Sequence, residues 1–365
     1  MNRTVLVLLL IFGQLPLAAA TRRRPVHNPA PSIAAAAIAT AAHQASDAAL
    51  KAGAPAVQIA VSDRGRIIYA GAFGLTDQES ENAATPRSVL QVGSITKQFT
   101  AAAILRLAER GALTLDDRIE KFVPEFNPRG ATITLRHLLT HTSGVGAISP
   151  NQYSPLTRQQ FITLVNAQPP EFTPGSDWSY SNTGYRLLGY AIESITGMSF
   201  ADVVQSEFAL PLGLIDTGVC GKSTLPLPDG YGLLQGGWNR IPAIHMSVPF
   251  AAGALCSTAS DLVRWSHLLA TGGVMLPASY EAMINPARLA DNTFVAYGLG
   301  LSLQNQLGRR AVWHTGGIPG FQSSLVYFPD EGIAVAVIIN ALPSPASVNA
   351  HLIALTVADA ALAPP

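Results

Sequence analysis

A serine and a lysine stand three residues apart at the start of a long apolar-periodic stretch. Ser94 and Lys97 open a helix that the pattern predicts to run to Arg110, with Gly111 as its C-terminal glycine. Residues three apart share a helix face, and a lysine whose pKa is lowered in an apolar pocket can take a serine's proton. The spacing indicates a serine nucleophile with a lysine base, although a helix cap beside a solvated charge has the same pattern.

A tyrosine and an asparagine stand at the entry to another predicted helix, residues 183–196. Tyr180 and Asn182 are separated by one serine. A tyrosine near a cation can have its pKa lowered and relay a proton. An asparagine amide can hold a lysine through its oxygen and a substrate carbonyl through its nitrogen. The pattern therefore indicates a proton relay and a positioning amide; a core tyrosine followed by a helix cap is the alternative.

A histidine, a threonine and two glycines follow an apolar strand expected at residues 311–314. They are His314, Thr315, Gly316 and Gly317. His and Thr can bind a substrate carboxylate, glycines let a substrate backbone lie close to a strand, and a strand N–H can complete an oxyanion hole. The alternative is a strand that ends in a glycine-rich turn with an exposed histidine. Each motif has such an alternative, but the alternatives do not account for all three motifs in this order, on a helix start, a helix entry and a strand end.

Apolar periodicity predicts strands at both ends of the chain and helices between them. Strands are expected at residues 56–61, 66–70, 311–314, 323–328 and 333–339. Helices are expected at residues 33–51, 94–110, 135–142, from 157, 183–196, 260–270 and 346–361. This order predicts an α/β (α+β) fold: an antiparallel sheet flanked by helices, formed by residues 33–90 and 290–365, with a mostly helical domain, residues 91–289, inserted. A site is expected where the two domains meet.

The three motifs together resemble those of the serine penicillin-recognising enzymes, Ser-x-x-Lys followed by a middle and a strand motif. The middle motif, Tyr180-Ser-Asn182, resembles that of class C β-lactamases and their relatives among D-alanyl-D-alanine carboxypeptidases and esterases. The resemblance extends from about residue 33 to 345, and includes residues 138–144, 180–189, 211–214, 252–262 and 314–321. The chain is thereby identified as a member of this penicillin-binding-protein-like serine hydrolase family, with a β-lactamase/transpeptidase-like fold as the expectation.

The resemblance implies a role for each motif residue. Ser94 would attack an amide, lactam or ester carbonyl, and Lys97 and Tyr180 would share the base and acid roles, the order between them being left open. Asn182 would position Lys97 and the substrate. The N–H groups of Ser94 and Gly317 would hold the oxyanion, and water would then release the acyl group. No cofactor is implied.

The strand motif departs from that of typical class C β-lactamases. They have Lys-Thr-Gly where this chain has His314-Thr-Gly, and a histidine is only partly charged near neutral pH. The departure weakens the expectation of efficient β-lactamase activity and leaves cell-wall peptides, β-lactams and esters open as substrates. Two alternatives are a carboxylesterase of the same fold and a penicillin- or peptide-binding sensor or scaffold with little turnover.

The composition limits the classes of molecule that the protein is expected to bind. Lys plus Arg equals Asp plus Glu at 23 each, so the net charge is zero and gives no electrostatic case for nucleic acid. His137 and His141 are four residues apart, but the glutamate of a His-Glu-x-x-His zinc helix is missing. We therefore expect no metal site and a small-molecule or peptide substrate; the sequence leaves the oligomeric state open.

The N-terminus is typical of an exported protein. Residues 1–20 combine Arg3, an apolar run from Val5 to Phe12 and small residues at 18–20, as in a signal peptide, and residues 21–32 form a linker. No later stretch is long enough to span a bilayer, so we expect a periplasmic or secreted protein without a stable membrane span after cleavage. Export permits a disulfide, and whether Cys220 and Cys256 pair is left open.

Overall fold

A six-stranded antiparallel sheet is built from the two ends of the chain. The computed structural model describes residues 33–222, 225–235 and 237–363, so the expected signal peptide and linker lie outside the described residues. The strand order is β11-β12-β13-β1-β2-β3. The strands are β1 Ala56–Asp63, β2 Arg66–Asp77, β3 Asn82–Ala83, β11 Val312–Ile318, β12 Phe321–Phe328 and β13 Ile333–Ile339. Because β13 pairs with β1, the C-terminal strands continue the N-terminal hairpin.

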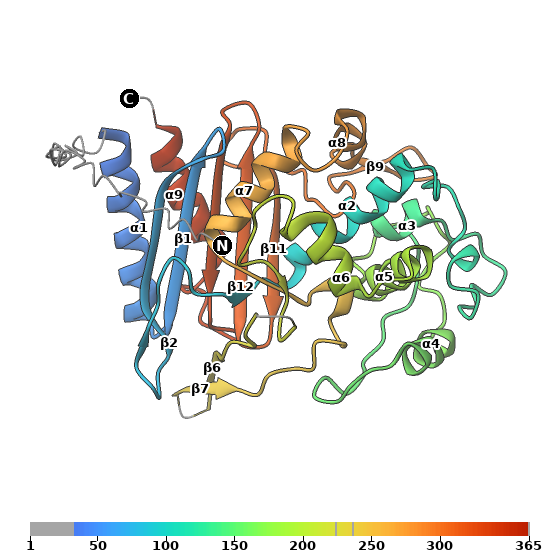
Figure 1. The fold of residues 1–365 in the computed structure, drawn as a ribbon, viewed down its shortest axis with the longest axis horizontal. Coiled ribbons are helices and arrows are strands. Elements are labelled where there is room, and N and C mark those ends of the chain that lie inside the picture. Colours follow the sequence, from blue (N-terminus) through green and yellow to red (C-terminus); the bar gives the residue numbers. More distant parts are fainter. Residues whose placement is uncertain (1–32, 223–224, 236, 364–365) are drawn as a thin grey trace, which may run out of the picture.

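Helices cover both faces of this sheet. Helices α1 (Ile33–Lys51) and α9 (Ala350–Leu362) lie together on one face, and α7 (Ala259–Ala270) lies on the other (Figure 1). An apolar core fills the space under α1 and α9, with Ile38, Val335 and Val357 among its members. The covered faces explain why every residue of β13 is buried and why its sequence is continuously apolar.

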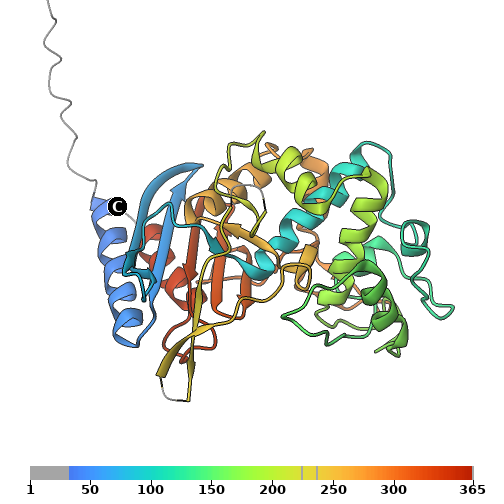
Figure 2. The ribbon, with the colours of Figure 1, turned by 60° about the horizontal axis from the view of Figure 1, so that its bottom comes forward.

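The middle of the chain forms a mostly helical part beside the sheet, shown mostly in cyan and green in Figure 2. Its helices are α2 Thr96–Glu109, α3 Leu135–Leu139, α4 Arg158–Ala167, α5 Asn182–Thr196, α6 Phe200–Val204 and α8 Pro277–Met283, with the short turns η1 Gly93–Ile95, η2 Ile119–Lys121, η3 Gln205–Ala209 and η4 Phe250–Ala252. Small sheets complete it: β4 Leu90–Gln91 with β8 Leu255–Ser257 and β5 Gly218–Val219, β6 Gly230–Leu234 with β7 Gly237–Ile241, and β9 Ala287–Arg288 with β10 Phe294–Val295.

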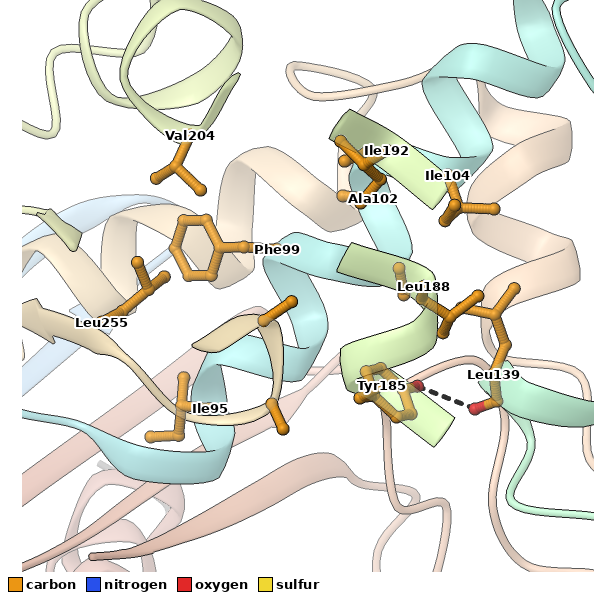
Figure 3. Close-up of a cluster of buried hydrophobic side chains, with 14 of the residues drawn as sticks. Ile95, Phe99, Ala102, Ile104, Leu139, Tyr185, Leu188, Ile192, Val204 and Leu255 are labelled. Atoms are coloured by element: carbon orange, nitrogen blue, oxygen red, sulfur yellow. Dashed lines mark hydrogen bonds between the residues drawn. The ribbon is translucent and has the colours of Figure 1, made fainter. Parts of the chain in front are cut away.

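Helix α2 is the buried centre of the helical part. The Phe99 ring stacks on that of Trp265 at 3.7 Å between centroids, and Phe99 contacts the cluster drawn in Figure 3. In the same cluster the Tyr185 hydroxyl donates to the Leu139 carbonyl at 2.7 Å, so α5 is tied to α3. A helix enclosed on every side holds its first turn, which begins at Thr96, in a fixed place.

The expected elements are found, with differences in their bounds. Strand β2 extends to Asp77, beyond the expected residue 70, and α3 ends at Leu139, before the expected residue 142. The helix expected from residue 94 begins as the 3₁₀ turn η1, and α2 starts at Thr96. The strand expected to end at His314 continues through both glycines to Ile318, because β12 pairs with it along its whole length. The last helix begins at Ala350, where the Asn349 side chain accepts from two backbone N–H groups as its cap. Helices α6 and α8 and the β6–β7 hairpin are additions to the expectation.

The two cysteines form a disulfide, which answers the question that the sequence leaves open. Cys220 and Cys256 are bonded across a separation of 36 residues. Cys256 lies in β8, opposite Gln91 of β4, so the bond anchors the strand that leads into η1.

Within the described part of the chain no single helix could cross a membrane, although the bent pair Asn182–Thr196 and Phe200–Ala209 meets the requirement by length and composition.

Candidate active site

The three sequence motifs come together where the helical part meets strand β11. Ser94 lies in η1, and Lys97 follows in the first turn of α2. Gly93 has a φ of +51°, and a Cβ on it would lie 2.9 Å from the Gly317 nitrogen, so glycine is required there. This close approach sets the Ser94 turn directly against the edge strand of the sheet.

Lys97 is fully buried and is surrounded by oxygen atoms. Its Nζ donates to Ser94 Oγ at 3.1 Å, to Asn182 Oδ1 at 2.8 Å and to the Ala252 carbonyl at 2.8 Å. Burial places the pKa of the ammonium well below its usual value. The site thus holds a lysine biased toward its neutral form within hydrogen-bond reach of a serine hydroxyl, which a general base requires.

Tyr180 completes this group from the loop before α5. Its ring centroid lies 4.7 Å from Lys97 Nζ. Burial of the hydroxyl raises the pKa of Tyr180, and a hydrogen bond with the Ser94 side chain offsets part of that rise. The residue as a whole is 39% exposed, but the pKa follows the surroundings of the hydroxyl. The phenol is therefore protonated at neutral pH and suited to give a proton, which differs from the lowered pKa that the sequence suggests.

His314 is buried and neutral. The sequence allows it partial charge, but only 5% of the residue is exposed, and burial followed by the nearby Lys97 charge lowers its pKa to about 4. Its Nδ1 lies 2.6 Å from the Thr315 carbonyl and its Nε2 lies 3.0 Å from the Tyr297 hydroxyl. Since a carbonyl only accepts, Nδ1 carries the proton and Nε2 accepts from Tyr297.

A hydrogen-bonded chain of side chains fixes that tautomer from its other end. The Ser181 N–H donates to His141 Nδ1 at 3.1 Å, so the His141 proton is on Nε2, 3.2 Å from the Tyr297 oxygen. Tyr297 accepts there and donates to His314. Burial, then the Lys97 charge, also places the pKa of His141 well below its usual value. We call this group (His141, Tyr297 and His314) the histidine–tyrosine relay; every member is neutral and has a partner.

His141 and Tyr297 were not among the expected site residues. His141 adopts a φ of +62°, a left-handed conformation that is uncommon outside glycine and often marks a functional constraint. The sequence offered two signals for His141: its place in segment 138–144 of the family resemblance, and its spacing of four residues from His137, which was considered only for a zinc site. Tyr297 is 156 residues from His141, and no local pattern connects the two.

The two glycines of the strand motif have different surroundings. A Cβ on Gly316 would overlap the Val92 carbonyl oxygen and the Ser323 hydroxyl, so Gly316 allows β11 to pack against the residues that precede Ser94. Gly317 is exposed, and the nearest atom to a Cβ there is a Leu342 methyl group at 3.5 Å. Of the two, only Gly317 leaves space for a substrate.

A cavity of about 370 Å³ opens beside Tyr180 and His314. Its lining residues are Trp178, Tyr180, Val295, Ala296, Tyr297, Ser302, Gln304, Trp313, His314 and Thr315. Aspartate, glutamate, lysine and arginine do not occur in this lining. The space beside Tyr180 is therefore largely aromatic and carries no charged side chain.

The two histidines that are four residues apart make hydrogen bonds within the protein. His137 Nδ1 accepts from the Thr134 N–H in a capping box at the start of α3, and His141 belongs to the relay. Among residues 33–222, 225–235 and 237–363 no group of three or more His, Cys, Asp or Glu side chains could hold a metal ion.

Comparison with known proteins agrees with the fold. The Beta-lactamase family matches residues 35–358. Penicillin-binding protein 4* of Bacillus subtilis (strain 168) is 29% identical over 296 residues, which are 75% of this chain and 65% of that protein, so the chain spans less than two thirds of this relative.

Solved structures give a similar result. A D-stereospecific amidohydrolase from Streptomyces sp. is 29% identical, with a TM-score of 0.74 over 88% of this chain and 98% of that one. The D-amino acid amidase from Ochrobactrum anthropi SV3 is 25% identical, with a TM-score of 0.77 over the same shares of 88% and 98%.

Proposed function

Because this chain belongs to the β-lactamase family, we propose that it is a serine hydrolase that acts through an acyl-enzyme on amide, ester or β-lactam carbonyls. The observation that carries the proposal is the contact of 3.1 Å between Lys97 Nζ and Ser94 Oγ inside a buried site. The similarity to amidases among the solved structures supports amides as one substrate class.

Acylation follows from the two opposite pKa shifts. Lys97, biased toward the neutral amine, takes the proton of Ser94, and Ser94 Oγ forms a bond to the substrate carbonyl carbon. The negative charge that develops on the carbonyl oxygen is received by the N–H groups of Ser94 and Gly317. Lys97 is thus the first base.

Departure of the leaving group uses the protonated phenol. Tyr180 gives its proton to the leaving nitrogen or oxygen as the carbon–leaving-group bond breaks, and the proton taken up by Lys97 replaces it. Asn182 keeps Lys97 in place through its Oδ1 and can direct its amide N–H₂ to the substrate. Water then attacks the acyl-enzyme with the neutral Lys97 amine as its base, and the proton that Lys97 takes up passes to Ser94 Oγ as the acyl group leaves, which restores the Ser94 hydroxyl.

We also propose that the chain acts outside the cytoplasm, in the periplasm or the medium. The apolar run near the N-terminus and the Cys220–Cys256 disulfide support this, because disulfides persist in oxidising compartments. N-terminal sequencing of protein recovered from the periplasm and the medium tests it; recovery only from the cytoplasm contradicts it.

Intact mass spectrometry of the protein tests the acyl-enzyme. The protein is incubated with a penicillin, a cephalosporin, a 4-nitrophenyl ester and an amino-acid amide, and adducts and products are followed with time. We expect product formation through an adduct on Ser94 that the Ser94→Ala variant lacks and the exposed-site control Ser149→Ala keeps. A lasting adduct without product indicates a sensor, and labelling that survives Ser94→Ala contradicts the assignment of the nucleophile.

A further inference from the structure

We infer that the cavity beside Tyr180 receives an uncharged leaving group, so that the substrates are amides or esters of neutral amines and alcohols. This inference rests on the proposed function and narrows it. It disfavours peptides and β-lactams that carry a carboxylate close to the scissile bond on the leaving-group side. Three features of the cavity support the inference: the catalytic group that lines it, the absence of charged side chains from its lining, and the aromatic side chains of its walls.

The position of Tyr180 identifies the cavity as the leaving-group side. Tyr180 lines it, whereas Ser94, Lys97 and Asn182 do not. The group that gives a proton to the departing atom must lie within hydrogen-bond reach of that atom. A substituent on the departing nitrogen or oxygen therefore extends past Tyr180 into this space.

The cavity offers a carboxylate no cationic partner. None of its lining residues is a lysine or an arginine. Lys97 is engaged with three oxygens behind Tyr180, and Arg288 stacks on the Phe294 ring at 5.7 Å instead of lining the cavity. Moving a carboxylate from water into a site without a cation is costly, because the neutral donors of Ser302, Gln304 and Thr315 replace only part of its hydration.

His314 cannot supply the missing charge or a free donor. Its Nδ1 proton is committed to the Thr315 carbonyl, and its Nε2 accepts from Tyr297. Protonation would also place a cation near Lys97, which becomes a cation itself when it takes the proton of Ser94, and would force two donors, Tyr297 and His314, to face each other. The relay therefore keeps this wall of the cavity uncharged at neutral pH.

The walls fit a flat apolar group. The rings of Trp178 and Tyr297 lie 5.9 Å apart between centroids, and Tyr180 adds a third aromatic side chain. A cavity of about 150 Å³ already binds benzene, so about 370 Å³ accommodates an aryl group with a substituent. Ser302 and Gln304 add neutral polar groups at the lining, which can bind an amide.

Two matched anilides test the inference. They share an acyl group and differ in the leaving group: 4-aminobenzamide, which is neutral, and 4-aminobenzoate, which is an anion. We expect kcat/KM to be at least about tenfold higher for the neutral leaving group, the discrimination of roughly one lost charge-assisted contact. Equal values for the two substrates, or a preference for the anion, would overturn the inference while leaving the proposed function intact.

A charge-introducing variant sharpens the test. Gln304 is exposed at the lining, so Gln304→Lys adds a cation to the cavity without burying it. We expect the preference for the neutral anilide over the anionic one to fall at least about fivefold. The control Gln159→Lys makes the same replacement at an exposed position of α4 and leaves the preference unchanged. An unchanged preference in Gln304→Lys contradicts the assignment of this cavity.

A binding measurement separates this inference from the catalytic proposal. Calorimetry on the Ser94→Ala protein, which needs no turnover, measures the affinities of 4-aminobenzamide and 4-aminobenzoate. We expect the neutral amine to bind at least about tenfold more tightly. Absence of turnover with all substrates would refute the proposed function, whereas equal binding of the two amines would refute the inference.

Discussion

Two buried polar clusters meet at Tyr180, and they handle protons in opposite ways. Around Lys97 a single nitrogen faces three oxygens, from Ser94, Asn182 and Ala252. In the histidine–tyrosine relay, each donor has one acceptor from the Ser181 N–H to the Thr315 carbonyl. The first cluster can lose or gain a proton without leaving a group unpaired, because the Ser94 hydroxyl can donate as well as accept.

The two clusters therefore have different tasks: the Lys97 cluster performs the chemistry, and the relay shapes the part of the site that recognises the substrate. The Lys97 cluster tolerates both protonation states, as a base must. The relay has its direction set by two backbone groups that cannot titrate, so an added proton breaks a hydrogen bond. Tyr180 lies between them, with its ring 4.7 Å from Lys97 Nζ and 6.1 Å from the His314 ring centroid. Substitutions in the Lys97 cluster should therefore lower the reaction rate, whereas substitutions in the relay should lower stability.

Removing the lysine has the largest effect. Lys97→Ala eliminates the base, so kcat is expected to fall by about 10²–10⁴-fold. The control Lys121→Ala removes a surface lysine paired with Asp117 and is expected to keep kcat within about twofold. Steady-state kinetics on an ester measures both. A near-normal rate in Lys97→Ala would show that the Lys97 cluster does not carry the chemistry.

Removing the phenol hydroxyl comes next. Tyr180→Phe retains the ring over Lys97 but removes the proton donor, so the rate is expected to fall by about 10²-fold. The loss should be greater for an anilide than for a 4-nitrophenyl ester, because the nitrophenolate needs no proton to depart. Tyr153→Phe, at a residue that is 52% exposed, is the control. Equal losses for both substrates would argue against Tyr180 as the acid.

Breaking the relay affects stability more than chemistry. Tyr297→Phe leaves His141 Nε2–H and His314 Nε2 without their partner, and the free energy of unfolding is expected to fall by about 3 kcal/mol. Tyr280→Phe serves as the control, since the Tyr280 hydroxyl makes no hydrogen bond within the described part of the chain and is expected to cost under about 0.5 kcal/mol. Urea unfolding at pH 7 measures both free energies. Equal losses of stability in the two variants would show that the relay does not stabilise the fold.

Acid should weaken the fold through the same cluster. His314 has a folded-state pKa of about 4 against 6.5 for the free side chain, so the unfolded state binds more protons between those values. This part of the stability is present above pH 6.5 and is lost as the pH falls toward 4, with about 2 kcal/mol lost by pH 5.

Urea unfolding at pH 7 and pH 5 measures that loss. The decrease in stability should be smaller in His314→Gln, which has no titrating ring, and unchanged in His245→Gln, at an exposed histidine. If His314→Gln keeps the full decrease, the relay is not the acid-sensitive element.

Local pattern was sufficient for much of the fold and for the motif residues. Strand β1 was predictable as a short apolar run that ends at a turn, and helix α5 was predictable from its 3.6-residue period. Gly197, with a φ of +68°, ends α5 as a C-terminal glycine does. Ser94 and Lys97 were predictable because their contact spans one helical turn. The helical continuation at α6 was not expected; its cap Ser199 follows directly after the end of α5.

Distance along the chain decided what could not be predicted. The pairing of Cys220 with Cys256 and the contact of His141 with Tyr297 depend on how separate segments pack. The packing role of Gly316 likewise depends on Val92, which belongs to another element. The residue types at these positions do not indicate which distant residue each one contacts.

The sequence by itself determined the family, the antiparallel sheet formed by both chain ends and the set of polar residues that could perform acyl transfer. These follow from residue type and spacing, which are local properties. Only the tertiary structure decided the state of those residues. Burial moves the pKa of Lys97 and His314 down and that of Tyr180 up, and burial is a property of the packed chain. The same packing left the cavity beside Tyr180 without charge.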